Sequence, residues 1–202
     1  MAFRTFAVFS IQQTNTPQPL VGSWITAGIS GPSNAPITLT LGAATSSGND
    51  ATNIFRASDR ALLVEPNGTK AEDVYISAVS GNTVTLSPKA SGTGPSGMSP
   101  VTENSHVSGA FGTGTFIIPN GQVNNLFVTC EDGNTGTWLY IGNAFNMTAT
   151  FRRIVKLAKS ATGSMPFNFG ATENYFGNPF VMSELWVYGT ATDLYNVSFA
   201  IV

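Results

Sequence analysis

The sequence predicts an all-β protein: a β-sandwich or jelly-roll-like fold with a hairpin meander and long loops rich in Gly, Ser and Pro. Almost every apolar stretch is short and β-branched or aromatic, and turn-forming residues bound it on both sides. No long segment with helical periodicity separates these stretches. The predicted strands are Phe3–Ile11, Ile37–Leu41, Ala61–Val64, Asp73–Val79, Thr83–Ser87, Gly114–Ile118, Asn125–Cys130, Thr137–Ile141, Val181–Tyr188 and Tyr195–Val202.

The clearest local prediction is a hairpin, because apolar side chains alternate along two segments separated by a turn signal. The alternating positions expected to share one face are Val74, Ile76, Ala78, Val84 and Leu86. Residues 80–82, Ser-Gly-Asn, tolerate the backbone of a tight turn. A Pro-Asn-Gly turn within residues 65–69 precedes the hairpin, so the segment from Leu62 to Leu86 is expected to form a small meander.

The segment 150–159 is ambiguous between helix and strand. Its apolar residues recur at spacings of three and four, as on a helical face, but β-branched residues interrupt it, and we favour a strand. Four of the nine basic residues of the chain lie here: Arg152, Arg153, Lys156 and Lys159. Because the chain as a whole is acidic, a solvated face or intersubunit ion pairs are favoured over contact with DNA. In a capsid, the cluster would contact an acidic groove on a neighbouring subunit, and we treat these four residues as the candidate capsid or subunit contact.

A long Ser/Gly/Pro-rich excursion follows the meander, over residues 87–113. It contains too few apolar residues to order itself, so we expect an arm that orders against a neighbouring subunit. The domain boundary is placed near residue 112. The prediction is an N-terminal strand and meander module over residues 1–112 and a C-terminal sandwich over residues 113–202, or one continuous domain.

Composition limits the function classes. Only one residue in ten is charged, against roughly a quarter in ordinary soluble proteins. Few charges suit a surface that becomes covered in an assembly. The net charge of -2 gives no attraction to nucleic acid, and no apolar run approaches the ~20 residues of a membrane-spanning helix. The single cysteine, Cys130, excludes an intrachain disulfide, fits a reducing cytoplasm and is expected to be a small buried residue.

No residue pattern predicts catalysis, a metal or a cofactor, so an enzyme is not expected. The one histidine, His106, lies in the excursion and is expected to be structural. The adjacent carboxylates of residues 72–73 and 131–132 would point to opposite faces of a strand. The loop 131–136, Glu-Asp-Gly-Asn-Thr-Gly, lacks the alternating acidic ligands of a calcium loop and is expected to be a hairpin loop.

Part of the chain resembles a β-module that recurs in structural proteins of tailed bacteriophages, in head-decoration, neck and tail components. The similarity lies in a Leu-Val strand at Leu63, the strand 72–76 (Glu-Asp-Val-Tyr-Ile), the segment 80–86 (Ser-Gly-Asn-Thr-Val-Thr-Leu), and His106 followed by Gly109. Such modules carry a basic-Gly pair after the second strand, where this chain has Ser-Pro-Lys at 87–89. The resemblance covers about a third of the chain.

The resemblance implies a capsid decoration or cement protein that stabilises the shell by binding the major capsid protein. It further implies a homo-oligomer, as trimers, located in the virion and assembled in the host cytoplasm. From the composition, neither a membrane nor nucleic acid is expected as a partner. A tail, neck or fibre-associated subunit is one alternative. Another is a host-surface carbohydrate-binding module, which would require an exposed tryptophan at Trp24, Trp138 or Trp186.

Overall fold

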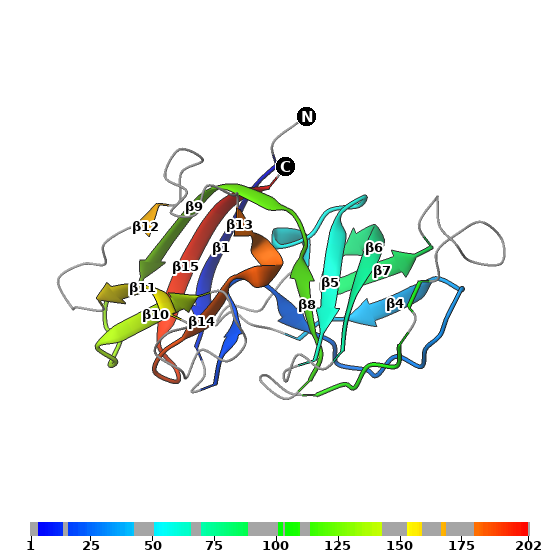
Figure 1. Cartoon of the computed structure of the whole chain (residues 1–202), viewed down its shortest axis with the longest axis horizontal. Helices are drawn as coiled ribbons and strands as arrows, with labels where there is room; N and C mark the ends of the chain where they lie inside the picture. Colours follow the sequence, from blue (N-terminus) through cyan, green and yellow to red (C-terminus); the bar gives the residue numbers. More distant parts are fainter. Residues whose placement is uncertain are drawn as a thin grey trace. The chain divides into compact units, whose positions relative to one another are not determined.

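The computed structural model confirms the all-β prediction (Figure 1). It describes residues 4–13, 16–42, 51–65, 70–88, 101–102, 104–109, 114–142, 153–158, 167–168 and 180–201. Over these residues the chain forms antiparallel strands and short 3-10 turns, without an α-helix, and none of the described segments is a helix long and apolar enough to cross a membrane.

The chain forms two compact units, and their limits differ from the predicted boundary near residue 112. The terminal unit comprises Met1–Val21 and Gly121–Val202, and the central unit comprises Gly22–Ala43 and Asn49–Asn120. The N-terminal strand belongs with the C-terminal part of the chain because it pairs antiparallel with the last strand along most of its length.

The terminal unit contains two antiparallel sheets. Sheet A has the order β1 (Arg4–Gln12), β15 (Leu194–Ile201), β9 (Gln122–Cys130) and β12 (Phe167–Asn168), and β13 (Phe180–Val181) also pairs with β9. In Figure 1, β15 (red) lies between β1 (blue) and β9 (green). Sheet B has the order β11 (Arg153–Ala158), β10 (Trp138–Gly142), β14 (Trp186–Tyr188) and β2 (Gln18–Pro19). The expected strand within residues 150–159 is therefore confirmed as β11.

Alternating burial identifies the core face of each sheet in the terminal unit. Fully or almost fully buried apolar side chains on these faces include Leu126, Val128, Cys130, Leu139, Ile141, Val187, Val197 and Phe199. The prediction that Cys130 is a small buried residue is thus confirmed. Because each buried aliphatic or aromatic side chain stabilises the fold by about 1.5–3 kcal/mol, these faces dominate the energetics of the unit.

The predicted strand Val181–Tyr188 is interrupted in the structure. A 3-10 turn, η3 (Met182–Glu184), separates β13 from β14. β13 pairs with β9 in sheet A, whereas β14 pairs with β10 in sheet B. The turn therefore moves the chain from one sheet to the other, which a continuous apolar run in the sequence does not reveal.

The central unit is one six-stranded antiparallel sheet that curls until its ends meet. Its order is β3 (Ser23–Trp24), β8 (Phe116–Pro119), β5 (Arg60–Val64), β6 (Ala71–Ser80), β7 (Thr83–Ser87) and β4 (Ile37–Thr40), with a 3-10 turn η1 (Ala51–Asn53). The ends are joined by a bridge between Ile25 and Leu41 and by the Gly42 amide, which donates to the Trp24 carbonyl at 2.9 Å. Buried Leu63, Ile76 and Leu86 help to fill the interior.

The predicted hairpin is confirmed, with one correction. β6 and β7 are joined through Gly81, whose φ of +53° suits a glycine in a two-residue turn. A bulge between Ile76 and Ala78 shifts the register, so Ala78 is exposed and the prediction that it shares the buried face is wrong. The predicted Pro-Asn-Gly turn falls on residues 66–69, which lie outside the described part of the chain.

Candidate functional site

The end of the predicted excursion binds back onto the central unit. We call the described residues 101–102 and 104–109 the strap. Its backbone runs antiparallel to the segment 25–33, with bridges between Thr102 and Ser33 and between His106 and Ile29. The His106 and Ile29 amides exchange hydrogen bonds of 3.0 and 2.9 Å. The expectation that this stretch orders against a neighbouring subunit is wrong for the strap, because residues 25–33 of the same unit supply its backbone partners.

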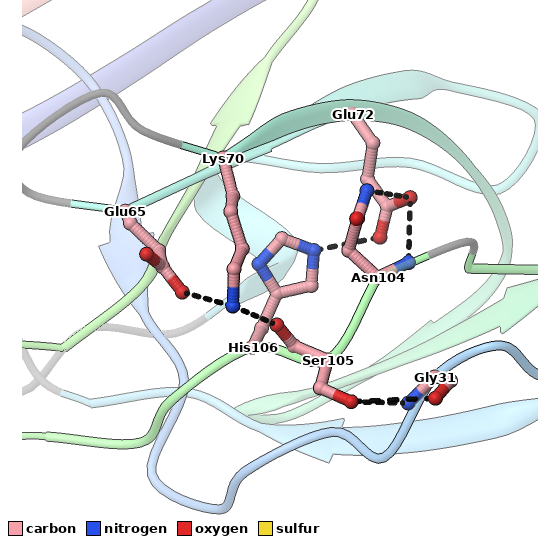
Figure 2. Close-up of polar contacts among 7 residues, drawn as sticks. All are labelled: Gly31, Glu65, Lys70, Glu72, Asn104, Ser105 and His106. Carbon is pink, nitrogen blue, oxygen red and sulfur yellow. Dashed lines mark hydrogen bonds and ion pairs between the residues drawn. The ribbon is translucent and has the colours of Figure 1, made fainter.

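A buried polar pair fixes the strap to the sheet (Figure 2). His106 Nε2 lies 2.6 Å from Glu72 Oε1 on β6. The His106 side chain has no exposed surface and the Glu72 side chain exposes 10%. The other carboxylate oxygen, Oε2, accepts hydrogen bonds of 3.3 Å from the backbone amide and the side-chain amide of Asn104. We call His106, Glu72 and Asn104 the latch.

Contacts next to the latch hold the strap from a second side. Lys70 Nζ donates to the Ser105 carbonyl at 3.0 Å and lies 3.4 Å from Glu65 Oε1. The Gly31 amide donates to Ser105 Oγ at 3.0 Å. A Cβ at Gly31 would overlap the carbonyl of Asn104, so the close approach of the two backbones requires a glycine.

The burial of the latch fits a structural role. A histidine with a carboxylate is a common catalytic pair, but a general base must reach a substrate proton. The His106 imidazole is closed off from solvent, and its Nδ1 has no hydrogen-bond partner among the described residues. The structural interpretation of His106 fits this burial, whereas its pairing with Glu72 was not predicted. The expectation that residues 72 and 73 face opposite ways holds, because Asp73 pairs instead with Arg60.

The strap presents one apolar side chain outward. Val107, next to the latch histidine, is 53% exposed. Its backbone carbonyl accepts a hydrogen bond of 3.1 Å from the Thr115 amide, and the preceding residue, His106, is hydrogen-bonded to Ile29. The backbone of Val107 is therefore held on both sides. Scattered exposed apolar residues are ordinary, but a rigidly held one can bind a partner with little loss of conformational entropy.

The loop 131–136 in the terminal unit is organised around a buried carboxylate. Asp193 accepts hydrogen bonds from the Thr135 amide at 2.8 Å, the Thr135 hydroxyl at 3.1 Å and the Gly136 amide at 2.9 Å. The hairpin prediction is wrong, because β9 and β10 belong to different sheets and the loop crosses between them. Within the described residues, no three acidic, His or Cys side chains form a group that could hold a metal.

Of the predicted basic cluster, the structure places one side chain. Arg152 and Lys159 lie outside the described residues, and Arg153 is the first residue of β11. Lys156 is exposed, and its Nζ lies 3.6 Å from the centroid of the Trp138 ring. A cation over an indole face is held by the ring quadrupole. Whether the four residues form a capsid or subunit contact stays a prediction.

None of the three tryptophans has the exposed side chain that the carbohydrate-binding alternative required. Trp186 is buried, and Trp24 is half-buried where the ends of the central sheet meet, against Gly42. Trp138 is half-buried on the outer face of sheet B. Tyr140 shares this face and lies directly opposite Tyr188 of β14 and Lys156 of β11. We call Trp138, Tyr140, Tyr188 and Lys156 the aromatic strip. Of these four residues, the sequence-based carbohydrate-binding alternative included only Trp138.

Tyr195 links two strands of the terminal unit from inside the core. Its hydroxyl donates to the Leu20 carbonyl at 3.0 Å and lies 3.3 Å from Gln18 Nε2, which donates to it. Complete burial raises the pKa of this phenol far above its ordinary value of 10.0, and the hydrogen bond from Gln18 offsets part of that rise. Tyr195 is therefore a neutral structural group.

Comparison with known proteins returned no matching family model, no matching curated protein and no matching solved structure. The resemblance to phage structural modules is therefore based only on the sequence segments quoted for it above. Two of those residues, Glu72 and His106, meet in the latch.

Proposed function

We propose that this chain is a capsid decoration protein of a tailed bacteriophage, which binds the major capsid protein and stabilises the shell. The observation that carries the proposal is how the few charged groups are used. Most of the carboxylates that the structure describes are bound by groups of their own unit. The pairs are Asp59 with the Arg56 amide, Asp73 with Arg60, Glu65 with Lys70, Glu72 with His106, Glu131 with Ser10, and Asp193 with Thr135.

A surface with few charged residues is suited to a static assembly. Net charge and dispersed charges keep isolated proteins apart, and this chain has only 10% charged residues and a net charge of -2. Covering such a surface requires little desolvation of ionic groups, so apolar and backbone contacts contribute nearly their full free energy. A shell offers many equivalent sites, and binding to the assembled state alone stabilises it by mass action.

The strap is the part of the central unit best suited to contact the shell. It holds Val107 outward at a fixed position, and the latch buries the polar groups beneath it. Assembly through trimers remains an implication of the family resemblance. A tail, neck or fibre-associated subunit would have the same surface chemistry, and only the location in the particle separates these roles.

The proposal is tested by adding the purified chain to phage heads that lack it. We expect saturable binding at a fixed number of copies per head and a higher temperature for release of the packaged DNA. Val107→Glu should lower the affinity for heads by about tenfold, because it places a charge in an apolar contact. Asn82→Asp is the matched control, since it adds the same charge at an exposed turn position.

Two results would overturn parts of the proposal. If the wild-type chain does not bind heads at micromolar concentration, the decoration function is wrong. If Val107→Glu and Asn82→Asp bind equally well and fold equally well by circular dichroism, the strap is not the contact, although the decoration function would stand.

A further inference from the structure

We propose that the aromatic strip on the outer face of sheet B binds an anionic saccharide, in which carboxylated sugars lie on the rings and pair with Lys156. This function goes beyond shell binding, and it uses the terminal unit in place of the strap.

The strip is a continuous surface over three adjacent strands. Tyr140 on the middle strand has Tyr188 directly opposite on one side and Lys156 directly opposite on the other. Directly paired residues have Cβ atoms about 5 Å apart. Trp138 lies two residues from Tyr140 on the same strand, so it shares the face at a spacing of about 7 Å. The rings are therefore near enough to contact a single oligosaccharide.

The core of the unit does not account for this concentration of rings. The inward face of β10 is formed by Leu139 and Ile141, which are fully buried. Sheet A gives the internal comparison: among its described side chains, the outward Thr129, Asn196 and Ser198 are polar, and Phe127 is an exposed aromatic residue. On the corresponding face of sheet B, the described aromatic residues are Trp138, Tyr140, Tyr188 and the buried Trp186.

Trp and Tyr are the aromatic residues suited to a half-wet surface, because each combines an apolar ring face with a polar group. A pyranose is complementary, since its C–H groups present an apolar face and its hydroxyls lie at the rim. Phe outnumbers both types in this chain, with 14 Phe against 3 Trp and 5 Tyr. The strip nevertheless contains no Phe.

Lys156 determines the charge of the expected ligand. Its ammonium group lies over the Trp138 ring, and within the described residues it forms no ion pair. A carboxylate on a sugar resting against the adjacent Tyr140, which lies directly opposite Lys156, would meet this ammonium at short range. Charge complementarity therefore selects a uronic-acid or sialic-acid type of saccharide over a neutral one.

Single-stranded nucleic acid also stacks on aromatic rings, but it fits the strip less well. Such binding needs a groove of several cations that follow the phosphates. The strip has one lysine, and the net charge of the whole chain is -2. Nucleic acid is therefore a competing outcome of the test.

The test is isothermal titration of the purified full chain with short oligomers of galacturonate, alginate, hyaluronate and polysialic acid. Each is compared with its carboxyl-reduced counterpart, and oligo-dT is the nucleic-acid probe. We expect at least one carboxylated oligomer to bind about tenfold more tightly than its reduced form. Tyr140→Ala should weaken that binding at least tenfold, because it removes the central ring.

Lys156→Met keeps the aliphatic stem and removes the charge at an exposed position, so folding is not at risk. It should abolish the preference for the carboxylated form and the salt dependence of binding. Phe127→Ala is the matched control, an exposed aromatic residue on the other sheet, and it should bind like the wild type. No binding of any oligomer, a preference that survives Lys156→Met, or tighter binding of oligo-dT would overturn the proposal.

Discussion

The two units use different chemistry to fix a loop. In the terminal unit, the Asp193 carboxylate accepts hydrogen bonds from the backbone amides of Thr135 and Gly136, and the side chains of Thr135 and Asn134 add further contacts to residues 193–194. In the central unit, the side chain of His106 in the strap pairs with the side chain of Glu72 on a strand. The Asp193 contacts require one residue identity and a loop whose backbone amides reach the carboxylate, whereas the pair of His106 and Glu72 requires two residue identities. We therefore expect substitutions of Asp193 and of Glu72 to lower the free energy of unfolding by different amounts.

The largest effect is expected in the terminal unit, for Asp193→Ala. The change leaves two backbone amides and a hydroxyl without an acceptor, and hydrogen bonds to charged groups contribute about 1.5–3 kcal/mol each. We expect a loss of about 3–5 kcal/mol in the free energy of unfolding, measured by urea denaturation. Faster amide exchange should be confined to β9, β10 and their connecting loop. Asp132→Ala, at an exposed position of the same loop, should change stability by less than about 0.5 kcal/mol.

A smaller effect is expected in the central unit, for Glu72→Gln. The amide keeps the shape and one acceptor oxygen but removes the charge that faces His106 and Asn104, so we expect a loss of about 1–3 kcal/mol. Amide exchange at Ile29 and His106 should accelerate, because the strap opens. Asp73→Asn is the adjacent control, since its partly exposed ion pair with Arg60 should contribute less than about 1 kcal/mol. Equal opening of the strap by both variants would refute the latch.

The smallest effect concerns Tyr195 and appears in alkaline solution. Because burial raises the pKa of the folded phenol above 10.0, the unfolded chain ionises first. Stability from this group is therefore complete below pH 10 and falls above it, by up to about 1.4 kcal/mol per pH unit. Tyr195→Phe should cost about 1–2 kcal/mol at pH 7 through its lost hydrogen bonds and should show a flatter decline from pH 10 to 11. Parallel pH profiles of the two proteins would contradict the burial argument.

Strands were predictable from the sequence where the apolar pattern alone determines them. The hairpin of β6 and β7 follows from alternation and Gly81, but the bulge that exposes Ala78 depends on pairing geometry and leaves no mark in the pattern. The sheet crossing at Met182–Glu184 was missed for the same reason, because an apolar run does not reveal which sheet receives each half.

The polar contacts were less predictable than the strands. The latch joins residues 34 positions apart, and no local spacing connects a glutamate on a strand with a histidine in a Gly-rich segment. The one available signal was the phage-module resemblance, which included both residues without pairing them. The aromatic strip was hidden because Tyr140 and Tyr188 come together only through the register of two strands far apart in sequence.

The central claim is that this chain decorates the phage head, and labelling of intact particles tests it most directly. An antibody raised against the chain would be bound to purified particles and located by immunogold electron microscopy. We expect label spread over the heads in a regular pattern. Label confined to the tail or neck, or particles without label although the antibody binds the purified chain, would contradict the claim.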